Sequence, residues 1–417
     1  RRVNKEAATA KSGRGAKRAR VLETAAKTLN RFGVSYASLP NVAEQLGISR
    51  AALYYYFDDQ EDLVFQSYQR SCEILAHNLD QAACAEGGAM AVIECFVDGI
   101  LGPDAPEIAS LSDMAYLGEE RRGIILARLG AIKDTLAGIL EDGAREGTLR
   151  PCASGIIAAC ILGLVSWPPV ARFWRSSETL THHDMIDAIK SLLREGIAAD
   201  RTRPVDFRPI DIEPPKLAVD HIFDSAAMTA AKQESLLAAA SWLFNLKGVD
   251  ATSLDEVAMR LGVTKKVIYH NLGDKETLVA ECYRRSFRFY ADVARNVITY
   301  DGTRIAAFIA STHAFATANL REDIAPLAPL SGVEALPDNV TEEINTTSAW
   351  LMDTFIELYE QGQREGSIRQ LNARAILAIQ PGSFEWLPKW YDALSDEERA
   401  RAPRELAELQ QLGLLAI

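Results

Sequence analysis

Residues Ser38–Leu63 read SLPNVAEQLGISRAALYYYFDDQEDL, and this segment contains the clearest local pattern in the chain. Apolar residues recur at helical spacing from Leu39 to Leu46, which predicts a short amphipathic helix. Gly47 suits a left-handed C-terminal cap, Ile48 can fill the core beneath the turn, and Ser49 suits the N-cap of a second helix. Two short helices joined by a Gly-containing turn form a helix-turn-helix, whose second helix can lie in a DNA major groove.

The same pattern returns 215 residues later (253 − 38 = 215), where Ser253–Leu278 reads SLDEVAMRLGVTKKVIYHNLGDKETL. An ungapped alignment of residues 20–70 with residues 235–285 contains 18 identities in 51 positions. Further along, Glu141–Arg150, EDGAREGTLR, matches Glu360–Arg369, EQGQREGSIR, at an offset of 219 (360 − 141 = 219). The chain is therefore an internal duplication, in which each copy has a helix-turn-helix head followed by a body.

Both heads resemble the TetR family of bacterial transcription regulators. The residues that carry the pattern in the first head are Ala25, Ala26, Phe32, Gly33, Leu53, Tyr54, Phe57, Glu61 and Leu63. Those in the second head are Ala240, Gly248, Ile268, Tyr269, Leu272, Lys275, Glu276 and Leu278. The resemblance implies a DNA-binding three-helix head and a helical body that binds a ligand and dimerises. The chain departs from the pattern at Gln60, where Lys is usual, and at Lys247 and Leu272, where Phe is usual.

The expected fold is all-α, because no stretch of the sequence shows the period-two alternation of a half-buried strand. We expect two tandem units, divided as follows: a disordered basic arm (residues 1–14), a first helix-turn-helix domain (15–62), a first body (63–199), a proline-rich linker (200–222), a second helix-turn-helix domain (223–277) and a second body (278–417).

The candidate DNA contacts lie in and around the two recognition helices. We expect Arg50 to read base edges, because Arg is the best bidentate partner of guanine, with Tyr55 as the second candidate. The full set in the first head is Ser38, Ser49, Arg50, Ala51, Tyr54, Tyr55 and Tyr56, and in the second head Ser253, Thr264, Lys265, Lys266, Tyr269, His270, Asn271 and Lys275. The alternative for the three tyrosines is that they pack on the surface under the first helix.

The charge of the chain is unevenly distributed. The whole chain carries −12, whereas residues 1–20 hold eight basic residues and one acidic residue, a net charge of +7 (8 − 1 = 7). An acidic body with a basic arm can approach a polyanion by one face. We therefore expect Arg14, Lys17 and Arg18 to contact DNA, and the alternative is a tail that only aids solubility.

The bodies contain large aromatic residues where the resemblance implies a small-molecule pocket. These candidate ligand-binding residues are Trp167, Phe173, Trp174, Trp350, Phe384, Trp386 and Trp390. The end of each copy is similar to repressors of fatty-acid and sterol breakdown, which implies an acyl-CoA-type or lipid-catabolism metabolite as the effector. The alternative for each residue is a place in the core or at an interface.

Several function classes lack support in the sequence. Six histidines show no metal-binding spacing, six cysteines form no C-x-x-C pair, and neither a P-loop nor G-x-G-x-x-G occurs. We therefore expect no enzyme, no cofactor and no metal site. The longest apolar run, Gly155–Trp167, is too short to span a bilayer, so we expect a cytoplasmic protein without membrane contact.

The expected partners are double-stranded operator DNA, a small hydrophobic effector and the other half of the same chain. Members of the family dimerise through their last two helices, and here both sets of helices lie in one chain. We expect Ala153–Trp167 and Thr181–Ala199 to pack against Asn372–Leu387 and Asp396–Leu412 as an intramolecular pseudo-dimer, with the two heads on the same side. The heads differ in sequence, so either they read different half-sites or one no longer reads DNA. Pairing of two chains, and a scaffold or sensor without DNA binding, remain as alternatives.

Overall fold

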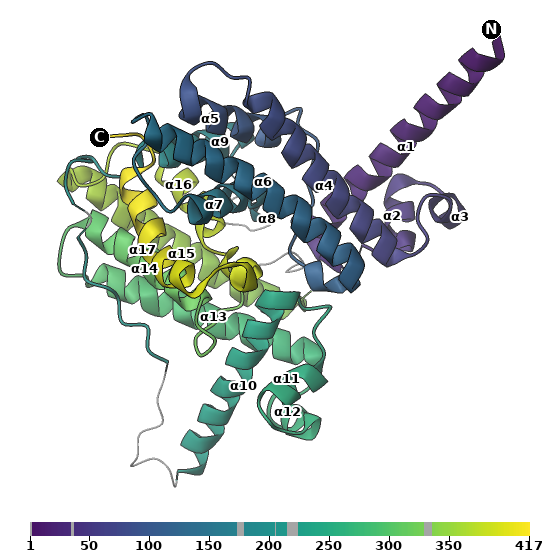
Figure 1. The fold of residues 1–417 in the computed structure, drawn as a ribbon. Coiled ribbons are helices and arrows are strands. Elements are labelled where there is room, and N and C mark those ends of the chain that lie inside the picture. The colour runs from purple at the N-terminus through teal and green to yellow at the C-terminus, as the bar shows by residue number, and fades with distance from the viewer. Residues whose placement is uncertain (1, 35–36, 173–178, 205, 215–223, 329–335) are drawn as a thin grey trace.

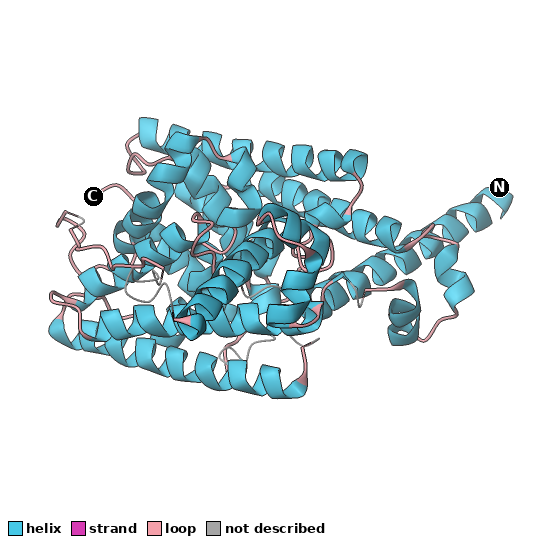
Figure 2. Ribbon diagram, turned by 90° about the horizontal axis from the view of Figure 1, so that it is seen from below, coloured by secondary structure: helices cyan, strands magenta, loops and turns pink. Residues whose placement is uncertain are grey.

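The computed structural model describes residues 2–34, 37–172, 179–204, 206–214, 224–328 and 336–417, with side chains from residue 15 onward. Within these ranges the chain is helical, and its extended pairings are two isolated β-bridges. The prediction of an all-α fold is confirmed. Figure 2 shows helices joined by loops throughout.

The first unit begins with a three-helix head and continues in a body. Its helices are α1 (Arg2–Phe32), α2 (Leu39–Leu46), α3 (Arg50–Tyr54), α4 (Gln60–Ala82), α5 (Gly88–Leu101), η2 (Met114–Tyr116), α6 (Glu119–Arg145), α7 (Ser154–Ser166), α8 (Pro168–Ala171) and α9 (His182–Glu195). In the body, α4 packs against α5 and α6, and α6 packs against α7.

The second unit repeats this order. Its helices are α10 (Ser225–Lys247), α11 (Leu254–Arg260), α12 (Lys265–Leu272), α13 (Lys275–Ile298), α14 (Arg304–Asn319), α15 (Asp338–Glu365), α16 (Ala373–Ile379), η6 (Gln380–Ser383), η7 (Leu387–Ala393) and α17 (Asp396–Leu412). The packing of α13 against α14 and α15 corresponds to that of α4 against α5 and α6.

The start of α1 differs from the sequence prediction. Residues 1–14 were predicted to be a disordered arm, whereas α1 runs from Arg2 and its first half projects away from the rest of the molecule (Figure 1). The segment is rich in Ala, Lys and Arg, which favour helix, and each of Gly13 and Gly15 opposes it by only about 1 kcal/mol. Residues 205 and 215–222 of the predicted linker lie outside the described residues.

The first head has a core of its own. Its buried apolar residues are Val21, Leu22, Ala25, Leu39, Val42, Ala43, Leu53, Phe57 and Leu63, separate from the large cluster that holds both bodies. The second head shares that large cluster. Its helix α10 packs against η7, where Trp242 and Tyr391 meet edge to face with ring centroids 4.9 Å apart. The two heads are therefore attached to the bodies in different ways.

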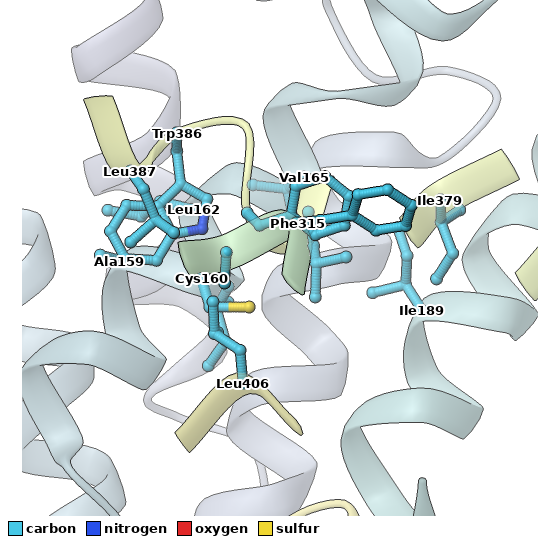
Figure 3. Close-up of a cluster of buried hydrophobic side chains, with 14 of the residues drawn as sticks. Ala159, Cys160, Leu162, Val165, Ile189, Phe315, Ile379, Trp386, Leu387 and Leu406 are labelled. Carbon is cyan, nitrogen blue, oxygen red and sulfur yellow. The ribbon is translucent and has the colours of Figure 1, made fainter. Parts of the chain in front are cut away.

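The two bodies pack together through the ends of both units. Helix α9 contacts α16 and α17, and α7 contacts η6 and α17. Figure 3 shows side chains from both units in one apolar cluster, with Cys160 and Val165 beside Phe315, Ile379 and Leu406. The helices that meet are those predicted to pack against each other within one chain.

Contacts between the bodies occur in symmetry-related pairs. Arg150 Nε donates to Gly413 O over 2.5 Å, and Arg369 Nε donates to Gly196 O over 2.8 Å. The donors are 219 residues apart (369 − 150) and the acceptors 217 (413 − 196), so each contact is the counterpart of the other. The bridges Leu149–Leu415 and Ala198–Ile368 form a second such pair. The interface is therefore isologous, as at a two-fold axis.

The units cross at two glycines of equivalent position. A Cβ added to Gly163 of α7 would overlap the carbonyl oxygen of Gly382 and the Trp386 ring, and one added to Gly382 would lie 2.9 Å from Trp167 Cβ. Only glycine allows the two backbones this close approach. In Figure 1 a diagonal from upper left to lower right separates the two units, with the first unit above it and the second below it. Both heads lie toward the lower right, and the C-terminus lies at the upper left.

One segment, Ser154–Ala171 in α7 and α8, is long and apolar enough to cross a membrane by composition. In this structure 67% of that segment is buried, where α7 packs against α6, α17 and η6. Its apolar character on all sides is accounted for by burial between the two bodies.

Candidate DNA-binding surface and ligand cavities

The first recognition helix presents its polar and aromatic side chains to solvent. Arg50 and Ala51 are exposed, as are Tyr54 at 57% and Tyr55 at 60%, whereas Leu53 faces the first-head core. Tyr56 is half-buried, packs against that core, and meets the Tyr55 ring edge to face at 5.3 Å. The packing alternative therefore applies to Tyr56, whereas Tyr54 and Tyr55 are largely exposed.

Two of the predicted DNA-binding serines act as helix caps. Ser38 Oγ accepts from the Asn41 N–H of α2 over 3.4 Å, and Ser49 Oγ accepts from the Ala52 N–H of α3 over 3.3 Å. These bonds satisfy N–H groups that a helix start leaves free, and they fix the angle of the recognition helix. A phosphate contact from either serine would use the remaining capacity of its hydroxyl group.

The acidic run after the first recognition helix, Asp58–Asp62, is partly neutralised by the body. Arg121, near the start of α6, lies 3.5 Å from Glu61 and 3.7 Å from Asp62. Glu61 also accepts from the Gly118 N–H over 2.9 Å. Gln60, which stands in place of the usual Lys, donates to Val34 O over 2.6 Å. The contact with Arg121 could not be predicted from local pattern, because Arg121 lies 60 residues from Glu61 (121 − 61 = 60).

The basic residues of α1 have two different placements. Arg18 Nη2 donates to Gln66 of α4 over 2.5 Å, so this guanidinium lies against its own head. Lys17 is exposed, and the side chain of Arg14 lies outside the described residues. Arg18 is exposed as well, so both Lys17 and Arg18 lie at the surface, and Arg18 is in addition held by Gln66.

The second recognition helix carries more lysines, but some are occupied. Lys265 Nζ donates to Asp255 of α11 over 2.9 Å, and this carboxylate raises the pKa of Lys265. Lys275 is half-buried, and desolvation lowers its pKa. Thr264, Lys266, Tyr269 and His270 are exposed, and Asn271 Nδ2 donates to Val267 O within α12. Ser253 caps α11 in a capping box with Glu256.

A buried asparagine joins each head to its body. Asn30 Nδ2 donates to Ile108 O over 2.9 Å and its Oδ1 accepts from Ser110 N. Asn245 makes the same pair of bonds, to Pro326 O over 2.8 Å and from Ala328 N. These residues were not among the sequence candidates, although their identity at the 215-residue offset (245 − 30 = 215) was a usable signal. They tie the C-terminal end of α1 and of α10 to the loop before α6 or α15.

The second head has a further connection, to the body of the first unit. Lys389 of η7 donates to Ser112 O over 2.6 Å, and the neighbouring Asp113 is buried beside Gly248 at the end of α10. Desolvation lowers the pKa of Lys389 to about 8, opposed by the Asp113 carboxylate. The same burial raises the pKa of Asp113. This junction brings the first body, the second body and the second head together.

Two cavities lie near the crossing of the units. The second-body cavity, of about 160 Å³, has residues of α13, α14, α15, α16 and η6 in its wall, with Trp167 of the first unit. The first-body cavity, of about 330 Å³, lies between α6 and α7 of the first unit and η7 of the second. Trp167 and Glu385 line both cavities.

The predicted ligand-binding residues divide between these cavities and other places. Phe384 lines the second-body cavity, and Trp386 and Trp390 line the first-body cavity. Trp350 lines neither and is 43% exposed on α15, because it lies on the outer face of that helix. Phe173 and Trp174 lie outside the described residues.

The chemistry of catalysis or metal binding has few candidates here. Among the described residues, no group of three or more His, Cys, Asp or Glu side chains could hold a metal ion. The six cysteines lie in described segments and none is in a disulfide. Burial raises the pKa of Cys72, Cys160 and Cys282 to about 12, which keeps these thiols protonated and unreactive.

Comparison with known proteins places both heads in one family. The family model described as bacterial regulatory proteins, tetR family, matches residues 21–66 and again residues 236–282. A model described as tetracyclin repressor-like, C-terminal domain, matches residues 90–197. The HTH-type transcriptional repressor KstR2 of Rhodococcus jostii (strain RHA1) is 24% identical over 200 residues, which is 45% of this chain and 94% of that protein.

Solved structures are similar to this chain over a comparable share of its length. The ketosteroid transcriptional regulator KstR2 of Mycobacterium tuberculosis is 17% identical, with 44% of this chain and 95% of that chain covered and a TM-score of 0.37. AibR in complex with isovaleryl coenzyme A and operator DNA is 20% identical, with 41% and 95% covered and a TM-score of 0.35. Each relative spans about one unit of this chain.

Proposed function

Since this chain belongs to the TetR family of bacterial regulatory proteins and carries two of its units in tandem, we propose that it is a sequence-specific, DNA-binding transcription regulator of the cytoplasm. The observation that supports this most directly is the first recognition helix. Arg50, Tyr54 and Tyr55 are exposed side by side on a head whose apolar residues are buried. Arg and Tyr are suited to bind base edges and the sugar-phosphate backbone.

The two heads act as unlike halves of one pseudo-dimer. The isologous body contacts set them at the same end of the molecule, as the two heads of a dimer would be (Figure 1). The first head presents Arg50 and tyrosines, and the second presents Lys266, Tyr269 and His270. Such a molecule fits an operator that is an imperfect palindrome, one half for each head.

The regulator acts as a repressor that a small hydrophobic ligand modulates. Repression is supported by the sequence similarity to KstR2, which is named a repressor. We assign an acyl-CoA-type or lipid-catabolism metabolite to the first-body cavity, where Lys133 and Lys389 lie alongside Asp134 and Glu385 and three tryptophans supply apolar surface. No enzymatic step is needed for this role.

A second candidate function is a tandem scaffold or sensor in which the second head no longer binds DNA. The specific observations in its favour are the Lys265–Asp255 ion pair and the half-burial of Lys275, which remove basic groups from that recognition surface. Under this alternative only the first head would contact DNA.

The test is selection of bound DNA from a random pool, followed by a salt titration on the selected sequence. We expect an enriched site with two unlike half-sites and a steep fall of log affinity with log salt. Enrichment of a single half-site would favour the scaffold alternative, and the absence of any enriched sequence would contradict the proposed function.

A further inference from the structure

The two cavities are counterparts that have diverged. At the 219-residue offset, Ser348, Met352, Pro381 and Glu385 of the second-body cavity correspond to Leu129, Lys133, Leu162 and Ser166 of the first-body cavity. Each cavity also includes a tryptophan of the other unit, Trp167 in one and Trp386 in the other. The basic Lys133 lies in the first cavity where the second has Met352. The acidic Glu385 stands where the first unit has Ser166, and it borders both cavities.

The second-body cavity is also lined by aromatic side chains of its own body, among them Phe287, Tyr290, Phe355 and Phe384. The corresponding residues of the first body, at offsets of 215 and 219, are Cys72, Leu75, Leu136 and Val165, and all four are buried in the packed core. Aromatic rings therefore enclose a space in one body that aliphatic side chains fill in the other.

Glu385 is the acidic group of this aromatic space. Its Oε1 accepts from the Tyr290 hydroxyl over 3.4 Å, whereas Oε2 is inaccessible to solvent and has no hydrogen-bond partner. Lys, Arg and His are absent from the lining of this cavity in the described part of the chain. Desolvation raises the pKa of Glu385 to about 8. A buried polar oxygen without a partner is costly, and it marks a place for a donor that a ligand can bring.

Resting on the proposed function, we propose that the second-body cavity binds a compact apolar amine, whose ammonium group pairs with Glu385 and whose hydrocarbon part lies among Phe287, Phe355 and Phe384. An ammonium group supplies both the missing donor and the missing charge, and aromatic faces attract cations further. Carboxylates, thioesters of coenzyme A and phosphates lack a cationic partner there. A cavity of about 150 Å³ holds a benzene-sized group, so an arylalkylamine is of suitable size.

The proton of Glu385 is accounted for whether the amine binds in its protonated or in its neutral form. A protonated amine displaces the Glu385 proton to water, and a neutral amine takes that proton directly, so the bound state is an ammonium–carboxylate pair in both cases. Below pH 8 such amines are protonated in solution, and we expect about one proton to be released for each amine bound.

The experiment is calorimetric titration of the full chain with three probes of similar shape. These are 2-phenylethylamine, 2-phenylethanol and 3-phenylpropanoate, and repeating the amine titration in buffers of different ionisation enthalpy counts the protons released. We expect the amine to bind about tenfold or more tightly than the alcohol, as a charge-assisted hydrogen bond provides, and the carboxylate to bind weakest. Glu385→Gln should remove most of the preference for the amine. Glu357→Gln, which changes an exposed carboxylate on α15, is the matched control and should retain it.

Tighter binding of the carboxylate, an unchanged preference in Glu385→Gln, or no amine binding would overturn the proposal. The titrations with the three probes and the proton count use the wild-type protein, so they test the proposal even if a variant fails to fold. DNA affinity is measured separately with and without the amine. Amine binding without any change in DNA affinity would support the site and contradict only its regulatory role, whereas failure of DNA binding alone would contradict the proposed function.

Discussion

Single residues differ in how far the sequence reveals their role. Arg50 follows a cap residue at the start of a recognition helix, so its exposure was predictable from local pattern alone. Glu385 was not predictable, because its surroundings come from Tyr290, which lies 95 residues away in the chain. Ile48 shows the same limit, since it was expected to fill the core beneath the turn and is 38% exposed.

Arg50 offers the sharpest test of base reading. Replacing Arg50 with Ala should cost about 1–3 kcal/mol in binding to the selected operator and relax the preference at one base position. The measurement is a binding titration on the operator, its single-base variants and random DNA. A loss of equal size on operator and random DNA would show that Arg50 contacts phosphate only.

Glu385 should leave a signature in the pH dependence of stability. Its folded-state pKa is raised from 4.5 to about 8, with Tyr290 as the titratable group beside it. Between these values the unfolded chain ionises first, so the wild type should lose stability relative to Glu385→Gln as pH rises from about 5 to 8. Melting temperatures of both proteins across this range test it. A constant difference would mean that the carboxyl group ionises freely, and Glu357→Gln should show no such trend.

At the scale of the element, helix positions follow from periodicity and caps, and tertiary roles do not. The cap at Ser49 lies where the sequence predicts it, whereas the caps at Ser38 and Ser253 are findings of the structure. The outward orientation of Trp350 depends on which face of α15 meets α13 and α14, and this information is spread over the whole body. The start of α1 at Arg2 differs from the disordered arm that the sequence predicts, because helix propensity outweighs the two glycines of the segment.

The first half of α1 should contribute charge to DNA binding. Deleting residues 1–18 removes seven of the eight basic residues in the first twenty and should weaken binding to every DNA sequence. The slope of log affinity against log salt should become shallower by about 0.9 for each lost phosphate contact. Salt titrations of both proteins measure this, and an unchanged slope would place the segment away from DNA.

The crossing of the units at Gly163 can be tested with a second glycine as the control. Gly163→Ala should destabilise the chain by about 1–3 kcal/mol, because the new methyl group meets the Gly382 carbonyl and the Trp386 ring. Gly138→Ala in α6 adds a methyl group with no neighbour within 4 Å and should stabilise by about 0.5–1 kcal/mol through helix propensity. Denaturant unfolding gives both values. Equal effects of the two substitutions would contradict the close crossing.

At the scale of the whole molecule, the repeat predicted the architecture well. Two offsets, 215 in the heads and 219 in the bodies, indicated which helices correspond, and the family resemblance indicated which ones meet. The different attachment of the two heads could not be predicted. It arises from Trp242, Tyr391, Lys389 and Asp113, which come from three separate parts of the chain and have no equivalent pattern in the first head.

The pairing of unlike heads predicts the result of a recognition-helix exchange. Placing Ser49–Tyr56 in positions 264–271 should make a symmetric palindrome the preferred site, because both heads would then read the same half-site. Selection from a random pool compares the chimera with the parent chain, and sedimentation shows whether one chain suffices. A chimera that keeps the parent preference would contradict the reading of one operator by both heads.

The covalent joining of the two bodies has a consequence for how such a regulator responds to gene dosage. A regulator that binds DNA only as a dimer of two separate chains occupies its operator roughly in proportion to the square of its abundance when it is scarce, because the dimer must form before it can bind. Here the partner arrives on the same polypeptide at a fixed effective concentration. Occupancy of the operator should therefore be directly proportional to the abundance of the protein down to a few copies per cell. A defective protein from one allele should also not inactivate the functional protein from another by forming a mixed dimer with it.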